Sequence, residues 1–224
     1  MATLPQQRKE QTRAKILDAA AVVFARRGYE AAKVEEITVE CGIAKGALYG
    51  HFASKEDLFQ TILLEQVNRR ISETAAQFAP GLSFRESILC ILDASWSSCR
   101  TDPTWSPLFA EFWALSSRSA WARDAAATLF DHCASALGRF LSDAKRQGLV
   151  RADLDVDRTC RLLLALNDGL VVQWQAQPAS VDPGQFHEAM ADMICAYVGN
   201  QHGAPPSPRK RAGSPTPARR AARS

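Results

Sequence analysis

The chain has 224 residues, of which 46 % are hydrophobic and 23 % charged, a composition typical of a globular protein with one or two domains. No apolar run approaches the roughly 18 residues of a transmembrane helix, which argues against a membrane protein. The first residues, MATLPQQRKEQTR, lack the apolar run of a secretory signal. Six scattered cysteines form no CxxC pair, so we expect free thiols, no metal site and a cytoplasmic location.

Positive charge is concentrated at the C-terminal end. Residues 203–224 hold six of the 27 basic residues and no acidic one, which leaves 21 basic and 24 acidic residues in 1–202. The net charge of +3 therefore comes from this segment, and evidence for a nucleic-acid site has to come from local charge. The segment lacks large apolar side chains and is rich in Pro, Ala and Ser, so we predict a disordered basic tail.

Apolar residues recur at helical spacing along most of the chain. A stripe from Ile16 to Phe24 predicts a helix over 8–27 that ends at Gly28, and two short helices follow, from Val34 and over 45–52. No apolar/polar alternation bounded by hairpin turns is present, so the predicted fold is all-α with about nine helices. The later stripes predict a helix over 54–78, a long helix that ends near Gly148, and two further helices over 157–177 and 184–201.

The segment 160–174, CRLLLALNDGLVVQW, is apolar almost all the way round. A helix of this kind is buried on all sides. The pattern predicts either a central core helix or a helix between its own core and a partner subunit. Asn167 and Asp168 lie within it and are interpreted as interface or helix-contact groups more readily than as ligand contacts.

The two short helices are joined by a turn at Gly42, a residue suited to a positive backbone dihedral, and Ile43 follows to fill the angle between them. This is the helix-turn-helix pattern, and the helix over 8–27 would pack behind it. The second helix keeps Lys45, Tyr49 and His51 for its outer face. Its N-terminus would favour a phosphate, and its first half would meet base edges in the major groove.

The helix over 54–78 would begin at a Ser54 cap with Asp57 in the capping-box position. Lys55 lies in its first turn, where a cation opposes the helix dipole, so we expect Lys55 to face DNA phosphate. For His51, simple packing at the helix end is the alternative.

The segment GIAKGALYGHFASKEDLF closely resembles the signature of the TetR/AcrR family of transcriptional regulators. The C-terminal half, with PLFAEFWALSS, VRADLDVD and LLLALNDGL, is similar to the AcrR/BetI-like ligand domain. Ala44 departs from the usual Ser or Thr cap of the recognition helix, and Gly50 from a larger residue. The resemblance implies that these residues bind DNA: Lys33, Lys45, Gly46, Ala47, Tyr49, Gly50, His51 and Lys55.

The five tryptophans all lie beyond residue 95, together with several phenylalanines. Core filling would explain any of them, but a mostly apolar pocket with a few polar groups is the usual form of a ligand site. Glu111 would be either exposed or a polar anchor in such a pocket. The ligand-binding candidates are Trp96, Trp105, Phe109, Glu111, Phe112, Trp113, Phe130, His132, Asn167 and Trp174.

Taken together, the sequence predicts a DNA-binding domain over 1–53, a ligand-binding and dimerisation domain over 54–202 and the tail over 203–224. The resemblance implies a homodimer on a palindromic double-stranded DNA operator, paired through 157–177 and 184–201, and a small apolar or aromatic effector that releases it. Repression is the default, and activation remains open. The alternatives are a DNA-architectural protein without effector and an all-α enzyme, although no catalytic or metal-binding constellation and no cofactor motif is present.

Overall fold

The computed structural model describes residues 4–77 and 81–199, and the predicted tail lies outside the described residues. Within these ranges the fold is all-α with nine helices and no strand, which confirms the predicted class. The helices are α1 Leu4–Arg27, α2 Val34–Cys41, α3 Lys45–Tyr49, α4 Lys55–Gln77, α5 Phe84–Thr101, α6 Trp105–Ser116, α7 Ala120–Arg146, α8 Val156–Ala176 and α9 Pro183–Val198.

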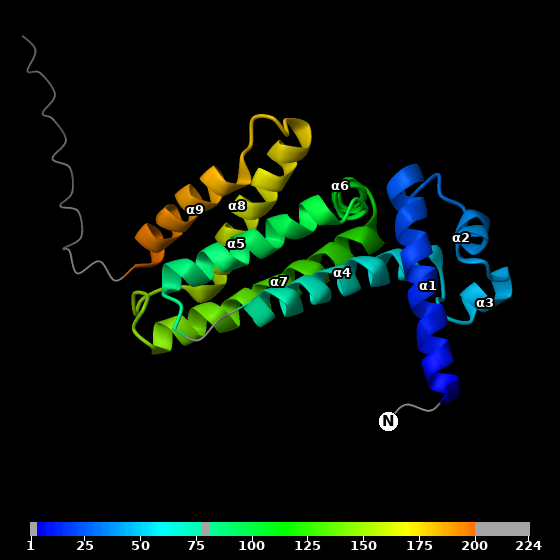
Figure 1. The fold of residues 1–224 in the computed structure, drawn as a ribbon, viewed down its shortest axis with the longest axis horizontal. Coiled ribbons are helices and arrows are strands. Elements are labelled where there is room, and N and C mark those ends of the chain that lie inside the picture. The colour runs from blue at the N-terminus through cyan, green and yellow to red at the C-terminus, as the bar shows by residue number, and fades with distance from the viewer. Residues whose placement is uncertain (1–3, 78–80, 200–224) are drawn as a thin grey trace, which may run out of the picture.

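The N-terminal helices form one end of an elongated molecule (Figure 1). There α2 and α3 lie on one side of α1, and α4 runs from this unit along α7 into the larger helical body. In that body α5 packs against α9, and α7 packs against both α6 and α8. α6 also contacts α1, so two helices of the body, α4 and α6, reach the N-terminal unit.

The predicted helix ends depend on two glycines and one capping serine. Gly28 and Gly42 end α1 and α2 at φ values of 77° and 69°, conformations that disfavour a side chain. At the start of α4, the Ser54 hydroxyl accepts from Asp57 N at 3.1 Å, and the Asp57 carboxylate accepts from Ala53 N at 2.8 Å. The predicted cap is therefore present.

Two predicted details differ in the structure. α1 begins at Leu4 and α3 ends at Tyr49, because Gly50 already serves as the C-cap of this short helix. Ala44 is the N-cap of α3 and forms no side-chain capping hydrogen bond, because its methyl group has no acceptor.

α8 is not buried on all sides, so the interpretation as a central core helix is wrong. Leu162, Leu166 and Val172 are 46 %, 43 % and 54 % exposed. The opposite side, with Cys160 and Leu163, is buried against the body of the same chain. The apolar residues around α8 therefore form two faces, one buried in its own chain and one exposed.

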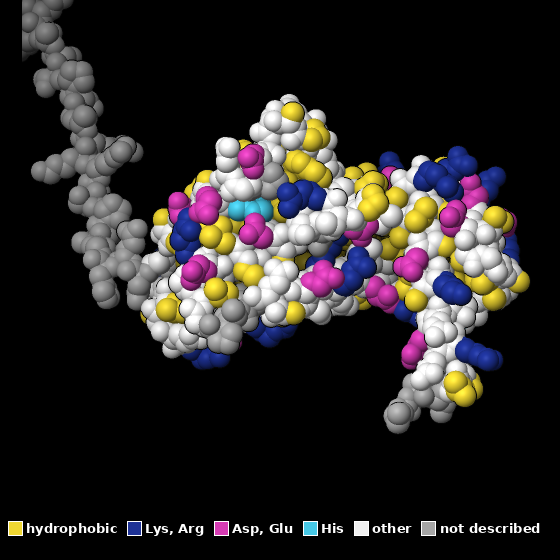
Figure 2. Space-filling view, in the orientation of Figure 1, with side chains coloured by type: hydrophobic (Ala, Val, Ile, Leu, Met, Phe, Trp, Pro, Cys, Tyr) yellow, Lys and Arg dark blue, Asp and Glu magenta, His cyan; other side chains and the backbone are white. Residues whose placement is uncertain are grey.

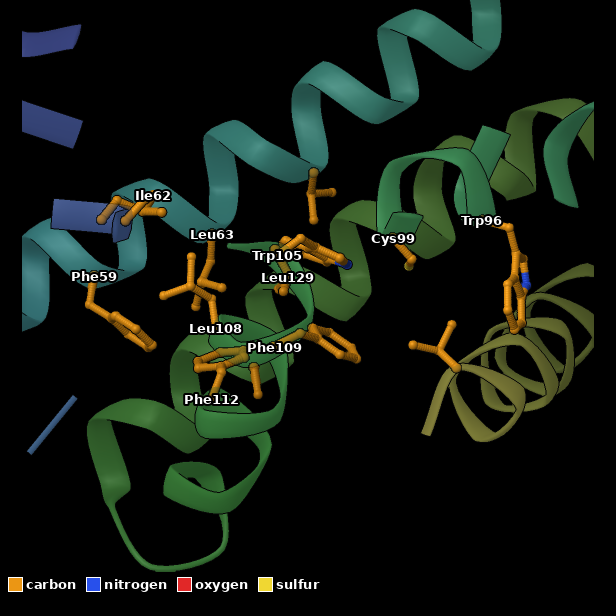
Figure 3. Close-up of a cluster of buried hydrophobic side chains, with 14 of the residues drawn as sticks. Phe59, Ile62, Leu63, Trp96, Cys99, Trp105, Leu108, Phe109, Phe112 and Leu129 are labelled. Carbon is orange, nitrogen blue, oxygen red and sulfur yellow. The ribbon is translucent and has the colours of Figure 1, made fainter. Parts of the chain in front are cut away.

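The core is continuous between the N-terminal unit and the body. Phe59 and Leu63 of α4 lie beside Leu108 and Phe112 of α6 (Figure 3). The Phe59 ring also packs against Phe24 of α1, with centroids 5.1 Å apart. The division at 53/54 stays a prediction, since this core includes residues from both sides of it.

Candidate functional site

The outer face of α3 is a small exposed surface at the end of the molecule. Lys45, Gly46, Ala47 and Gly50 are exposed and the Tyr49 side chain is 47 % exposed, whereas Leu48 is buried beneath them. Figure 2 shows Lys and Arg side chains around this end, interspersed with Asp and Glu. This end of the molecule is therefore not uniformly basic, and any contact with an anionic partner depends on the positions of individual lysines and arginines.

Lys45 forms an ion pair with Glu35 of α2, with Nζ 2.6 Å from Oε1. This hydrogen bond raises the pKa of Lys45 and lowers that of Glu35. Both side chains are more than half exposed, so the lysine can leave this partner for a phosphate at little cost. Lys33 is also exposed and starts α2, where its backbone N donates to Glu36 at 3.1 Å.

Lys55 does not face outward as predicted. Its Nζ donates to the carbonyl oxygens of Tyr29 at 2.8 Å and Ala32 at 3.2 Å, with Glu30 O at 3.4 Å. It also lies 4.4 Å from the Tyr29 ring centroid. The expectation is corrected because an ammonium has three donors, and the turn between α1 and α2 offers three carbonyls to them.

His51 is partly buried just beyond α3 and lies beside Phe52, with ring centroids 6.4 Å apart. Its Nδ1 is buried without a hydrogen-bond partner among the described residues. The DNA-binding role of this histidine stays a prediction.

An inner cavity of about 390 Å³ lies between α4, α5, α7 and α8 and the start of α6. Four sequence-predicted residues line it: Trp105, Phe109, Phe130 and Asn167. An outer hollow of about 890 Å³ lies beside it, and the exposed Trp113 is among its lining residues. Phe109, Phe130, Leu164 and Asp168 line both spaces, so the outer hollow adjoins the inner cavity at these residues.

Three predicted aromatic residues lie outside both spaces: Trp96 and Phe112 are in the core, and Trp174 is partly buried against it. Trp96 is fully buried and packs against Trp174, with centroids 5.6 Å apart. Phe112 is buried against Phe59 of α4. Core filling, the alternative that the sequence left open, therefore describes these three side chains.

Glu111 and His132 also lie away from the cavity, which corrects their placement. Glu111 Oε1 accepts a hydrogen bond from Tyr29 N at 3.1 Å, so this carboxylate joins α6 to the N-terminal unit. His132 Nε2 lies 2.5 Å from Asn68 Oδ1 and is exposed on the surface between α7 and α4. Glu111 is partly buried on the side of α6 that carries the buried Leu108 and Leu115, and helical spacing alone does not say which unit that side faces.

The most unusual cavity residue, Arg70, is not among those predicted from the sequence. Its guanidinium lies 3.6 Å from the Trp105 ring centroid, and burial lowers its pKa to about 10. A signal was present, because Arg70 continues the buried stripe of Leu63 and Val67 at spacings of four and three.

Asp168 is the second polar residue that the sequence did not place in the cavity. Burial raises its pKa to about 6. Its neighbour Asn167, which was predicted, accepts a hydrogen bond from Ser95 Oγ at 3.3 Å. The cavity thus combines aromatic walls with a few polar groups, the usual composition of a small-molecule site.

Among the described residues, no helix has the length and apolarity needed to cross a membrane. Two family models match the chain: bacterial regulatory proteins of the tetR family over residues 16–62, and the C-terminal domain of BetI-type transcriptional repressors over 84–199. The first match contains the helix-turn-helix, and the second contains most of the cavity wall.

Known relatives agree with these models. The probable transcriptional regulator ArpR of Pseudomonas putida is 28 % identical over 77 % of this chain and 84 % of its own length. The regulator UidR of Escherichia coli K12 is 27 % identical over 82 % of this chain and 91 % of its own length.

Among solved structures, FadR from Bacillus subtilis in complex with stearoyl-CoA has the same fold, with a TM-score of 0.73 and 19 % identity. The alignment covers 83 % of this chain and 98 % of FadR. The family and the curated relatives are regulators and not enzymes, which removes the enzyme alternative. This chain therefore belongs to the tetR family of bacterial transcriptional regulators, and its C-terminal half is of the BetI type.

Proposed function

We propose that this regulator is a ligand-released repressor, which binds a palindromic operator as a homodimer in the cytoplasm and leaves it when a small apolar or aromatic effector occupies the inner cavity. The observation that carries the proposal is that both helices linking the body to the N-terminal unit also line the cavity. Without such a cavity, a DNA-architectural role would be favoured.

The turn 28–32 is contacted by both of these helices. α6 contributes Phe109 to the cavity wall and Glu111 to the hydrogen bond with Tyr29. α4 contributes Arg70 to the cavity, and Lys55 at its start binds three carbonyls of the turn. A ligand that favours one position of α4 or α6 would thereby shift α1 and the attached recognition helix.

DNA recognition is assigned to the exposed face of α3 and its surroundings. The residues proposed to contact the operator are Lys33, Lys45, Gly46, Ala47, Tyr49, Gly50 and His51. The N-terminal half of a recognition helix meets base edges, and the neighbouring lysines bind phosphates and fix the register.

The homodimer is proposed to form through α8 and α9. Both helices expose apolar side chains that this chain leaves uncovered: Leu162, Leu166, Val172, Phe186, Met193 and Tyr197. Two helices from each subunit would form a four-helix interface around a two-fold axis. Such an interface would place two copies of α3 on one side of the dimer, as a palindromic operator requires.

The proposal is tested by selecting bound fragments from a random DNA library and reading their symmetry. Enrichment of an inverted repeat, with half-sites about one helical turn or a multiple of it apart, is the expected result. Sedimentation of wild type and Leu166→Arg measures dimerisation, with Val39→Arg as the control because Val39 is 82 % exposed on α2. Selection of no preferred sequence would favour the architectural alternative, and a wild-type monomer at micromolar concentration would refute the dimer.

A further inference from the structure

The inner cavity is lined by a cation, Arg70, and two of its three guanidinium nitrogens have no hydrogen-bond partner among the described residues. The Nε and Nη2 atoms of Arg70 are inaccessible to solvent, and no hydrogen-bond partner for either lies among the described residues. Asp102 is within ion-pair distance of Arg69, at 3.2 Å, and not of Arg70. The Asp102 carboxylate and the Cys99 thiol nevertheless lie close enough to raise the pKa of Arg70, so they offset part of the effect of its burial. Buried polar groups in proteins are nearly always hydrogen-bonded, and a buried unpaired charge is costly.

The position of Arg70 in α4 is held by its surroundings. The guanidinium stacks on the Trp105 ring with Cζ 3.6 Å from the centroid, which fixes its plane. A planar guanidinium presents parallel N–H donors that match the two oxygens of a carboxylate. Trp105 and Phe109 also stack, with centroids 5.2 Å apart, and continue the aromatic wall away from the cation.

The balance of charge around the cavity also favours an anion. Among the described residues that line it, Arg70 and Arg139 are basic and Asp168 is the single acid. Asp168 lines the outer hollow as well as the inner cavity. Burial raises the pKa of Asp168 to about 6, which reduces the repulsion that an anion would meet there as the pH falls.

We infer that the effector is an amphiphile with an anionic oxygen head group, of the carboxylate type, which pairs with Arg70 while an apolar or aromatic body fills the space between Phe109, Phe130 and Leu137. This inference rests on the proposed ligand-sensing function and specifies its chemistry. Glu111, which the sequence offered as a possible polar anchor of the pocket, has no part in this site, because it lies outside the cavity. A hydrated Arg70 without a role in ligand binding is the competing explanation.

Three probes with one ring system separate these possibilities. Naphthalene-2-carboxylate, naphthalene-2-carboxamide and 2-naphthylmethylammonium have similar shape and differ in charge. Their affinities for the full chain are measured by calorimetry, with tryptophan quenching as a second signal. Wild type is expected to bind the carboxylate at least about tenfold more tightly than the carboxamide, because hydrogen bonds to charged groups are the stronger ones.

Arg70→Met keeps an unbranched apolar side chain and removes the guanidinium charge. It is expected to weaken carboxylate binding about 20-fold or more and to change carboxamide binding less than about threefold. Arg70→Lys keeps a cation without the paired donors and should retain part of the preference. Arg123→Met is the matched control, since Arg123 is an exposed arginine of α7 outside the cavity lining, and it should change both affinities less than about threefold.

Each remaining result contradicts the inference in a distinct way. Equal affinity for carboxylate and carboxamide, or tighter binding of the ammonium probe, would overturn the anionic head group while leaving a ligand-binding cavity in place. An equal loss of both affinities in Arg70→Met would show that Arg70 acts only on the shape of the cavity. If no probe bound at about 1 mM, a level that corresponds to roughly −4 kcal/mol, the ligand-sensing role would fall together with the inference.

Discussion

The Glu111 carboxylate accepts a hydrogen bond from the backbone N–H of Tyr29, 82 positions earlier in the chain, at 3.1 Å. The acceptor belongs to α6 and the donor to the turn after α1, so the bond spans the boundary between the body and the N-terminal unit. Tyr29 also packs against Trp121 of α7, with ring centroids 5.2 Å apart. A polar and an aromatic contact therefore hold the same turn.

Glu111→Ala is expected to lower the free energy of unfolding by about 1–2 kcal/mol, because Tyr29 N loses its partner in a partly buried site. Glu111→Gln keeps an acceptor and should cost less. Urea titration measures both changes. If the proposed coupling holds, Glu111→Ala should also reduce the effect of a bound ligand on DNA affinity. An unchanged ligand effect together with the stability loss would restrict Glu111 to a structural role.

Substitutions of Lys45 and Lys55 should have different effects on DNA binding and stability, although both lysines lie in the segment that resembles the family signature. Lys45→Ala is expected to weaken DNA binding and to lower the salt slope by about one phosphate contact, with little effect on folding. Lys55→Met should leave the slope unchanged and lower the melting temperature, since three backbone carbonyls lose their donor. Gel shifts over a series of salt concentrations, with thermal unfolding, distinguish the two. A reduced salt slope for Lys55→Met would show that Lys55 contacts a DNA phosphate after all.

Tyr49 is the exposed aromatic residue of α3, and its role is proposed to be base recognition. Tyr49→Ala should reduce the preference for the selected operator over random DNA by about 1–3 kcal/mol. Tyr49→Phe distinguishes the contribution of the hydroxyl group from that of the ring. Competition binding at physiological salt gives the preference directly. Wild-type preference in Tyr49→Ala would show that another part of the surface recognises the bases.

Asp168 should make the stability of the protein depend on pH. Its pKa is about 6 in the folded chain and near 4 when unfolded, so the folded state binds more protons between these values and stability falls as the pH rises through them. Asp168→Asn removes this loss. The stability of the variant relative to wild type should therefore rise from pH 4 to pH 7, by about 2 kcal/mol.

The control for this measurement is Asp124→Asn, at an exposed position of α7. Its stability relative to wild type should be constant over the same pH range. Urea unfolding at pH 4, 5, 6 and 7 supplies the comparison. A relative stability of Asp168→Asn that stays flat with pH would mean that Asp168 is solvated in the folded protein.

The sequence by itself determined the all-α fold class, most of the helix ends and the family. Helical spacing of apolar residues depends only on local geometry, and Gly28, Gly42 and Ser54 act within their own turns. The helix-turn-helix could be predicted for the same reason, because its spacing is contained in about 20 consecutive residues. Even the exposed Tyr49 could be placed, since Leu48 beside it follows the buried face of the helix.

Only the tertiary structure decided which partner each polar residue meets. Lys55 and Glu111 were expected at a phosphate and in a pocket, and both hold the turn 28–32. Arg70 and Asp168 lie nearly 100 positions apart and line one cavity. A helical period says which face of a helix is buried, but the neighbour on that face is set by how whole helices pack. Contacts of charged groups are formed across such packings, so their roles follow from the fold and not from local spacing.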